Sequence, residues 1–297
     1  MLTVSPVRFE HRDCALGLGT ASPRLSWQVS TDDPDWAQTA YELELDGSAT
    51  VRVDSCDQVL VPWPFDPLTS RARTTVRVRV ASGGQRTGWS EPATAETGLL
   101  QPRDWTGRFI SPRTLGGIGQ PAPVLTRGIN LRSPIVSARL YATAHGVYVA
   151  TLNGARVGDE VLAPGWTSYH HRLRYQTYDV TSLLREGENK LAVLLGNGWF
   201  RGHLTGGGRR ALYGDRLALL AQLEVTYADG SVDVIGTDQR WSAAGSGILP
   251  MTYTTGSGPT CALAHRVRTR WTCCTRTWAG WSPRTGRRCA SPVCCPR

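Results

Sequence analysis

Residues 147–154 read VYVATLNG, and this stretch decides how the second half of the 297-residue chain is interpreted. Residues 147–152 are apolar, aromatic or β-branched, which is typical of a strand, and Asn153-Gly154 is a residue pair that favours a tight hairpin turn. Residues 137–144 (SARLYATA) have the same strand-like character and end close to Gly146. We therefore expect neighbouring antiparallel strands in an all-β domain.

Further strand patterns follow this hairpin. Residues 174–180 (RYQTYDV) alternate, and residues 190–195 (KLAVLL) are mostly apolar, as expected when both faces of a strand are covered. Residues 179–184 (DVTSLL), followed by Glu186-Gly187, predict one short helical turn. Residues 125–250 as a whole predict a jelly-roll β-sandwich.

Residues 1–100 predict a separate domain of short strands. Residues 75–80 (TVRVRV) alternate between apolar and polar side chains, which places one face of a strand in a core and the other in water. About seven such strands in a domain of this length indicate an immunoglobulin-like or fibronectin type III-like sandwich. Trp27 and Trp89 are expected to be core residues.

Residues 101–124 are rich in Pro and Gly and predict a linker between the two sandwiches. Trp105 and Phe109 are the bulky aromatic residues of this segment. We expect them to pin it to a neighbouring surface.

Charge is distributed unevenly along the chain. The formal net charge is +9, but residues 251–297 carry eight Arg and no Asp, Glu or Lys. The rest of the chain has 25 basic and 24 acidic residues and is therefore almost neutral. We therefore expect no nucleic-acid partner. No apolar run reaches the length of a signal peptide or a membrane span, which predicts a cytoplasmic protein without a membrane partner. The oligomeric state has no signature in the sequence.

Cysteine is concentrated in the same segment. Six of the eight Cys lie in residues 251–297, some of them in the adjacent pairs Cys273-Cys274 and Cys294-Cys295, and none in a C-x-x-C spacing. Structural zinc sites use spaced pairs that converge on one ion. We expect no metal site and no cofactor, and an irregular, disordered tail from residue 251.

Several motifs in the second domain resemble the N-terminal sandwich of bacterial α-L-rhamnosidases. The motifs are long, ordered and well spaced. They are LNGARVG at 152–158, LAPGWTSY at 162–169, YQTYDVT at 175–181, GNGWFRG at 196–202 and YGDR at 213–216. Residues 1–100 resemble the fibronectin-like module that precedes this sandwich in the same enzymes.

The resemblance implies hydrolysis of terminal α-L-rhamnose from glycosides. In this family an α/α barrel further along the chain inverts the anomeric centre with two carboxylates, one as acid and one as the base that activates water. No part of the present sequence resembles that barrel. We therefore assign no catalytic residue and expect this chain alone to be inactive.

The tail from about residue 251 has lost the family pattern. Relatives continue with an acidic segment resembling D-L-Y-D-G-E-x-x-D-x-R, and a shifted reading frame of GC-rich codons beginning within the Met251 codon permits a similar segment. A frameshift also explains the excess of Arg and Cys. Our hypothesis is that residues 251–297 are a frameshift product.

One loop combines an aromatic side chain with planar polar groups, the mixture that suits sugar recognition. Its candidate carbohydrate-binding residues are Asn197, Trp199, Arg201, Tyr213 and Asp215. The alternative is that Trp199 packs inside the sandwich or against a catalytic barrel. Trp166 follows Pro164-Gly165, a turn expected to fold this tryptophan inward.

Three classes of function remain open from the sequence. The first is the N-terminal part of an α-L-rhamnosidase, or of another glycosidase such as a β-galactosidase-like enzyme. The second is a carbohydrate-binding module that acts without a barrel. The third is a scaffold that orients another domain.

Overall fold

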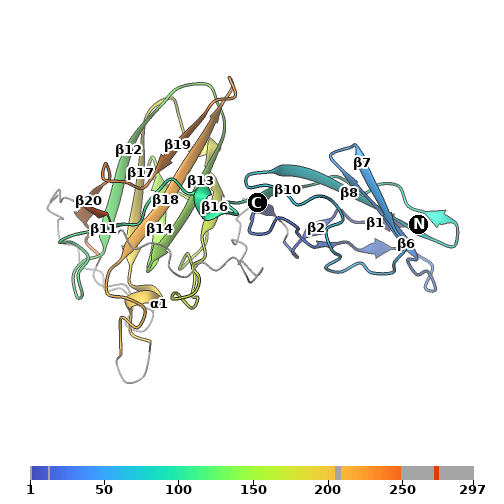
Figure 1. Cartoon of the computed structure of the whole chain (residues 1–297), viewed down its shortest axis with the longest axis horizontal. Coiled ribbons are helices and arrows are strands. Elements are labelled where there is room, and N and C mark those ends of the chain that lie inside the picture. The colour runs from blue at the N-terminus through green and yellow to red at the C-terminus, as the bar shows by residue number, and fades with distance from the viewer. Residues whose placement is uncertain (1, 13, 205–208, 249–270, 274–297) are drawn as a thin grey trace. The chain divides into compact units, whose positions relative to one another are not determined.

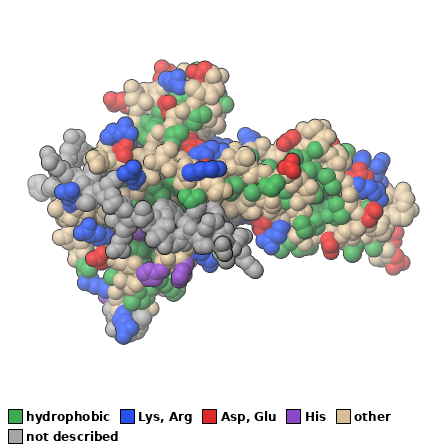
Figure 2. All heavy atoms as spheres, in the orientation of Figure 1, with side chains coloured by type: hydrophobic (Ala, Val, Ile, Leu, Met, Phe, Trp, Pro, Cys, Tyr) green, Lys and Arg blue, Asp and Glu red, His purple; other side chains and the backbone are tan. Residues whose placement is uncertain are grey.

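The computed structural model describes residues 2–12, 14–204, 209–248 and 271–273 (Figure 1). Their elements are nearly all β-strands, which confirms the predicted fold class. The chain divides into two compact units, and the division in sequence lies between Asp104 and Trp105. Figure 2 shows basic and acidic side chains interspersed on the visible face.

The first unit is built around a six-stranded sheet in the order β3-β10-β8-β6-β7, with β9 paired to β8. Two small sheets, β1-β5 and β2-β4, complete it. The strands are β1 Thr3–Val4, β2 Arg8–Phe9, β3 Ala15–Leu18, β4 Leu25–Ser26, β5 Val29–Ser30, β6 Ala40–Leu45, β7 Ala49–Val53, β8 Arg73–Ser82, β9 Gln85–Arg86 and β10 Ala93–Thr97.

The two predicted core tryptophans of this unit have different surroundings. Trp27 is buried, donates its indole N–H to Gln38 Oε1 at 3.0 Å, and meets the Tyr41 ring edge-on. Trp89 is only half-buried, and the Arg79 guanidinium lies 4.3 Å from its ring centroid. The prediction was right for Trp27 and wrong for Trp89, because a strand-flanking indole is also stabilised on the outer face by a cation.

The second unit consists of two sheets whose inner faces share one hydrophobic core. The first has the order β16-β13-β18-β11-β21, with β19 paired to β18, and the second has the order β15-β14-β17-β12-β20. The strands are β11 Ile110–Pro112, β12 Pro123–Leu131, β13 Ile135–His145, β14 Val147–Leu152, β15 Ala155–Arg156, β16 Gln176–Asp179, β17 Gly187–Gly196, β18 Ala218–Tyr227, β19 Val232–Gly236, β20 Ser242–Gly245 and β21 Trp271–Cys273.

The predicted hairpin and helical turn are both present. β14 pairs with β15 across Asn153 and Gly154, whose φ angles are 54° and 88°. These positive angles explain the Asn-Gly pair, since few other residues adopt them at low cost. A 3₁₀ turn, η2, spans Thr181–Leu183.

β17 alternates more strongly than its sequence indicates. Leu191, Val193 and Leu195 are buried in the core, whereas Ala192 and Leu194 on the opposite face are only half-buried. The expectation that both faces are covered is therefore wrong for the described residues. The described part of the chain leaves the outer face of this sheet only partly covered.

The segment expected to be a linker, residues 101–124, contributes regular structure. It contains a 3₁₀ turn, η1 (Pro102–Asp104), as well as β11 and the start of β12. Trp105 meets the Tyr175 ring at 5.4 Å, and Phe109 stacks on His145 at 4.5 Å, so both aromatic residues anchor the segment as predicted.

The predicted irregular tail, residues 251–297, lies largely outside the described residues. Within it, Trp271–Cys273 forms β21 and pairs antiparallel with β11, so these three residues are a strand and not irregular. In the described part of the chain no helix has both the length and the apolar character needed to cross a bilayer. Those same residues bring no three His, Cys, Asp or Glu side chains together as a metal site would require.

Candidate functional site

The predicted carbohydrate-binding residues gather around α1 (Gly198–Arg201), a single helical turn that follows β17. Gly198 begins this turn with φ +49°, and a Cβ there would lie 2.4 Å from Val147 Cγ1. Any other residue would therefore clash with β14. Glycine at this position brings α1 against the sandwich and fixes where the neighbouring side chains project.

Arg201 points inward from α1 and is 5% exposed. Its Nε and one terminal nitrogen donate to Asn197 Oδ1 at 2.8 and 2.6 Å, and the other terminal nitrogen donates to the carbonyls of Gly116 at 2.6 Å and Asp215 at 3.2 Å. Burial lowers the pKa of the Arg201 guanidinium from its usual value. Arg201 thus ties three chain segments together, and Asn197 is its acceptor.

Asp215 takes part in this arrangement through its backbone carbonyl, while the residue itself is exposed. The five predicted residues therefore have different structural roles. Asn197 and Arg201 hold the loop together, and Trp199 and Tyr213 provide aromatic surface.

Trp166 joins this aromatic surface. Its ring is parallel to that of Trp199, with 7° between the planes and 6.1 Å between centroids, and its indole N–H donates to Tyr213 Oη at 3.3 Å. Trp166 is 53% exposed, so the expectation that the turn folds it inward is wrong. We call Trp166, Trp199 and Tyr213 the aromatic face.

A column of rings supports the aromatic face from below. Tyr213 packs on Tyr169 at 4.9 Å, Tyr169 meets Phe200 edge-on at 5.3 Å, and His145 stacks between Phe200 and Phe109 at 4.7 and 4.5 Å. Burial lowers the pKa of His145 to about 4 and raises the pKa of Tyr169 to about 12. Both rings are therefore neutral at pH 7, as their packing against hydrocarbon requires.

The chemistry available at the aromatic face is stacking. A half-exposed indole that is held in place by a second indole and a tyrosine hydroxyl offers a flat apolar surface with a polar edge. The C–H face of a pyranose fits such a surface. Sequence reasoning found Trp199 and Tyr213 but missed Trp166, whose exposure depends on a partner 33 positions away in the chain.

Comparison with protein families matches both units of the chain. Residues 4–101 match the Rha78A-like N-terminal immunoglobulin domain, and residues 133–257 match the α-L-rhamnosidase N-terminal domain. The immunoglobulin-type match agrees with the predicted class of the first sandwich.

Individual relatives and solved structures that match this chain are also α-L-rhamnosidases by name. An α-L-rhamnosidase of Streptomyces avermitilis is 44% identical over 170 residues, which cover 54% of this chain and 16% of the relative. One of Formosa agariphila is 31% identical over 254 residues, which cover 78% of this chain and 27% of the relative. The crystal structure of the native α-L-rhamnosidase from Aspergillus terreus superposes with a TM-score of 0.80 at 41% identity, over 86% of this chain and 31% of that one.

The matched regions lie in the N-terminal part of these enzymes, and the chain spans less than a third of the length of each relative. The chain therefore belongs to the α-L-rhamnosidase family, of which it carries the N-terminal immunoglobulin-like domain and the N-terminal β-sandwich domain.

Proposed function

We propose that this chain is the non-catalytic N-terminal region of an enzyme that hydrolyses terminal α-L-rhamnose from glycosides, and that the chain alone has no hydrolase activity. The observation that carries the proposal is the match of both units, in order, to the N-terminal domains of α-L-rhamnosidases. Rhamnose-containing glycosides are then the substrates of the whole enzyme. The two carboxylates that inversion requires would come from a further domain.

The surroundings of three carboxylates that lie on strands support inactivity of the chain alone. On the large sheet of the first unit, Glu42 pairs with Arg79 and Glu44 with Arg77. In the second unit Asp179 pairs with Arg139 at 3.0 Å. These carboxylates sit on strands and serve ion pairs, whereas an inverting pair needs two carboxyl groups that face each other across a sugar and a water.

Incubation with p-nitrophenyl α-L-rhamnoside tests the proposal. The 297-residue protein should release no nitrophenol, whereas a protein extended with the family's acidic segment and barrel from downstream DNA should release it. Turnover by the chain alone would refute its inactivity. Downstream DNA that encodes no barrel in any reading frame would refute both the frameshift hypothesis and the proposed enzyme.

Carbohydrate binding by the second unit is a second candidate function, and the half-exposed Trp166 on the aromatic face favours it. The structure of a Streptomyces avermitilis α-L-rhamnosidase, 24% identical, was solved with L-rhamnose. Calorimetric titration of this chain with L-rhamnose, with Trp166→Ala beside Trp89→Ala as the matched control, separates binding from a scaffold role. Heat that only Trp166→Ala abolishes supports binding, and no heat with any protein leaves the scaffold function.

A further inference from the structure

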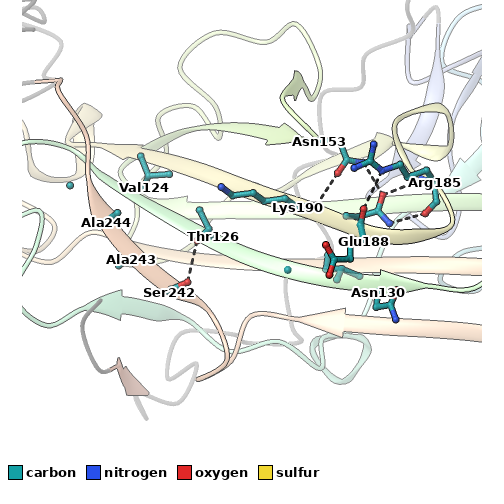
Figure 3. A pocket seen from close by; sticks show the side chains of 14 residues that line it. Val124, Thr126, Asn130, Asn153, Arg185, Glu188, Lys190, Ser242, Ala243 and Ala244 are labelled. Carbon is teal, nitrogen blue, oxygen red and sulfur yellow. Dashed lines mark hydrogen bonds between the residues drawn. The ribbon is translucent and has the colours of Figure 1, made fainter. Parts of the chain in front are cut away.

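A groove of about 1070 Å³ runs along the outer face of the sheet that contains β17, β12 and β20 (Figure 3). β20 pairs with β12 only from Pro123 to Thr126, and β12 continues beyond it to Leu131. The groove follows β12 past the point where its pairing with β20 ends. It lies on the face that β17 leaves open, and none of its lining residues belongs to the aromatic face.

The floor of the groove contains a glycine at a position where the packing of the neighbouring residues leaves room for a side chain. Gly128 lies inside β12 opposite Lys190, and a Cβ placed on it would meet no atom within 4 Å. Glycine inside a strand weakens it and often marks a close approach by a ligand. Here the missing side chain keeps the groove open.

Three polar side chains at one end of the groove have no partner among the residues that the structure describes. Lys190, Glu188 and Asn130 are exposed, and within the described residues none makes a side-chain hydrogen bond or ion pair. Figure 3 shows Glu188 beside Asn130, and Lys190 extended along the groove toward Thr126. An ammonium donor, a carboxylate acceptor and an amide are therefore all available to a ligand.

The other end of the groove is apolar, and hydroxyls lie between the two ends. Val124 and Ala244 are half-buried neighbours on paired strands, and Leu194 lies opposite Val124 on β17. The hydroxyl oxygens of Thr126 and Ser242 are 3.2 Å apart. The lining thus changes from aliphatic to hydroxyl to charged along its length.

One wall of the groove is fixed by a network of amides. Asn153 Nδ2 donates to Asn189 Oδ1 at 2.7 Å, and Asn189 Nδ2 donates to the Arg185 carbonyl at 2.7 Å. The backbone N–H of Lys190 donates to Asn153 Oδ1 at 2.9 Å. These bonds hold the hairpin turn against the start of β17, so the wall needs no ordering when a ligand binds.

We propose that this groove binds a short stretch of neutral glycan that contains a 6-deoxy sugar. The methyl group and C–H face of such a sugar suit Val124 and Ala244, while its hydroxyls suit the Thr126 and Ser242 hydroxyls and the Lys190–Glu188 end. The Glu188 carboxylate at that end repels a polyanion, even though Arg185 and Lys190 also line the groove. The choice of L-rhamnose as the deoxy sugar rests on the proposed function.

The only lysine of the chain, Lys190, makes a direct test possible. Reductive methylation with ¹³C-formaldehyde labels Lys190 and the terminal amine alone, which gives a single lysine signal in an NMR spectrum of the 297-residue protein. Titration with rutinose, a disaccharide of L-rhamnose and glucose, should shift this signal in a saturable way. Cellobiose should shift it less, and inorganic phosphate should leave it unchanged.

Gly128→Val places a side chain in the groove at a position where an added Cβ meets no atom within 4 Å, and this variant provides the comparison. This variant should melt no lower than the wild type and lose the rutinose-induced shift, whereas Gly88→Val, at another open glycine outside the groove, should retain the shift. A shift that persists in Gly128→Val, no shift at all, or an equal shift with phosphate would overturn the site. An equal shift with cellobiose would overturn the deoxy-sugar assignment. Hydrolysis by the extended protein is measured separately, so failure of the groove and failure of the proposed enzyme are distinguishable.

Discussion

The side-chain carbonyl of Gln222 accepts the backbone N–H of Thr106 at 2.6 Å and the Thr106 hydroxyl at 3.0 Å. Gln222 is fully buried in β18, and its amide nitrogen donates to Glu224 Oε1 at 2.7 Å. One buried side chain thus attaches the first residues of the second unit to the middle of its sheet.

Replacing Gln222 by Leu should destabilise the second unit. The substitution keeps the volume but removes the acceptor of the Thr106 N–H and one donor to the buried Glu224 carboxylate, a loss that costs about 1–3 kcal/mol. The free energy of unfolding from urea titration measures the loss. Gln120→Leu, in the loop before β12, is the control and should change little; an equal loss in both would contradict the role given to Gln222.

Substitutions at two glycines are expected to change the stability of the protein in opposite directions. A Cβ on Gly236 would lie 2.6 Å from the Cα of Gly107, so Gly236→Ala should cost about 1–3 kcal/mol through overpacking. Gly128→Ala meets open space and should stabilise the protein by about 0.5–1 kcal/mol. Thermal unfolding should rank the proteins Gly128→Ala, wild type, Gly236→Ala, and any other order argues against the packing described.

Stability should fall as the pH is lowered from about 6.5 to about 4, because His145 is stacked between two phenylalanines and its folded pKa is lowered to about 4. In this window the unfolded chain binds a proton that the folded protein excludes. The full effect is on the order of 3 kcal/mol, and below pH 4 it grows no further because the folded state is then protonated as well.

His145→Phe keeps the stack and removes this titration. Its free energy of unfolding should depend less on pH than that of the wild type between these limits. The exposed His171, changed to Gln, should leave the wild-type profile intact. Parallel profiles for His145→Phe and wild type would show that another group is responsible.

Arg201→Met should loosen the aromatic face without touching it. The methionine removes the donors to Asn197, Gly116 and Asp215, which leaves the buried Gly116 carbonyl without this donor and costs about 1–3 kcal/mol. The exposed Arg209→Met is the matched control. Unchanged melting and tryptophan fluorescence in Arg201→Met would refute a positioning role for this guanidinium.

Local chemistry explains which parts of the fold could be predicted. The hairpin at Asn153-Gly154 and the turn at Thr181–Leu183 follow from short-range preferences, and both are present. Trp89 and Trp166 were placed wrongly, because their exposure depends on partners brought together by the tertiary fold: Arg79 for the first, Trp199 and Tyr213 for the second.

The same reasoning applies to the segment expected to be a linker. Its glycines and prolines indicate irregular backbone, yet Ile110 is fully buried and Thr106 is bound by Gln222, which lies 116 positions later. No local sequence pattern predicts a contact between residues so far apart in the chain. In the candidate site, the residue types at 197–202 predict a sugar-binding loop, but the inward direction of Arg201 depends on the folded structure.

The position of Lys190 has a practical consequence for anyone who measures binding on a sensor surface. Amine-reactive coupling would attach this protein through its terminus or through that one side chain, and molecules captured by the latter would present a blocked groove to the flowing sugar. A false negative from such an instrument is avoided by immobilising the protein through an affinity tag.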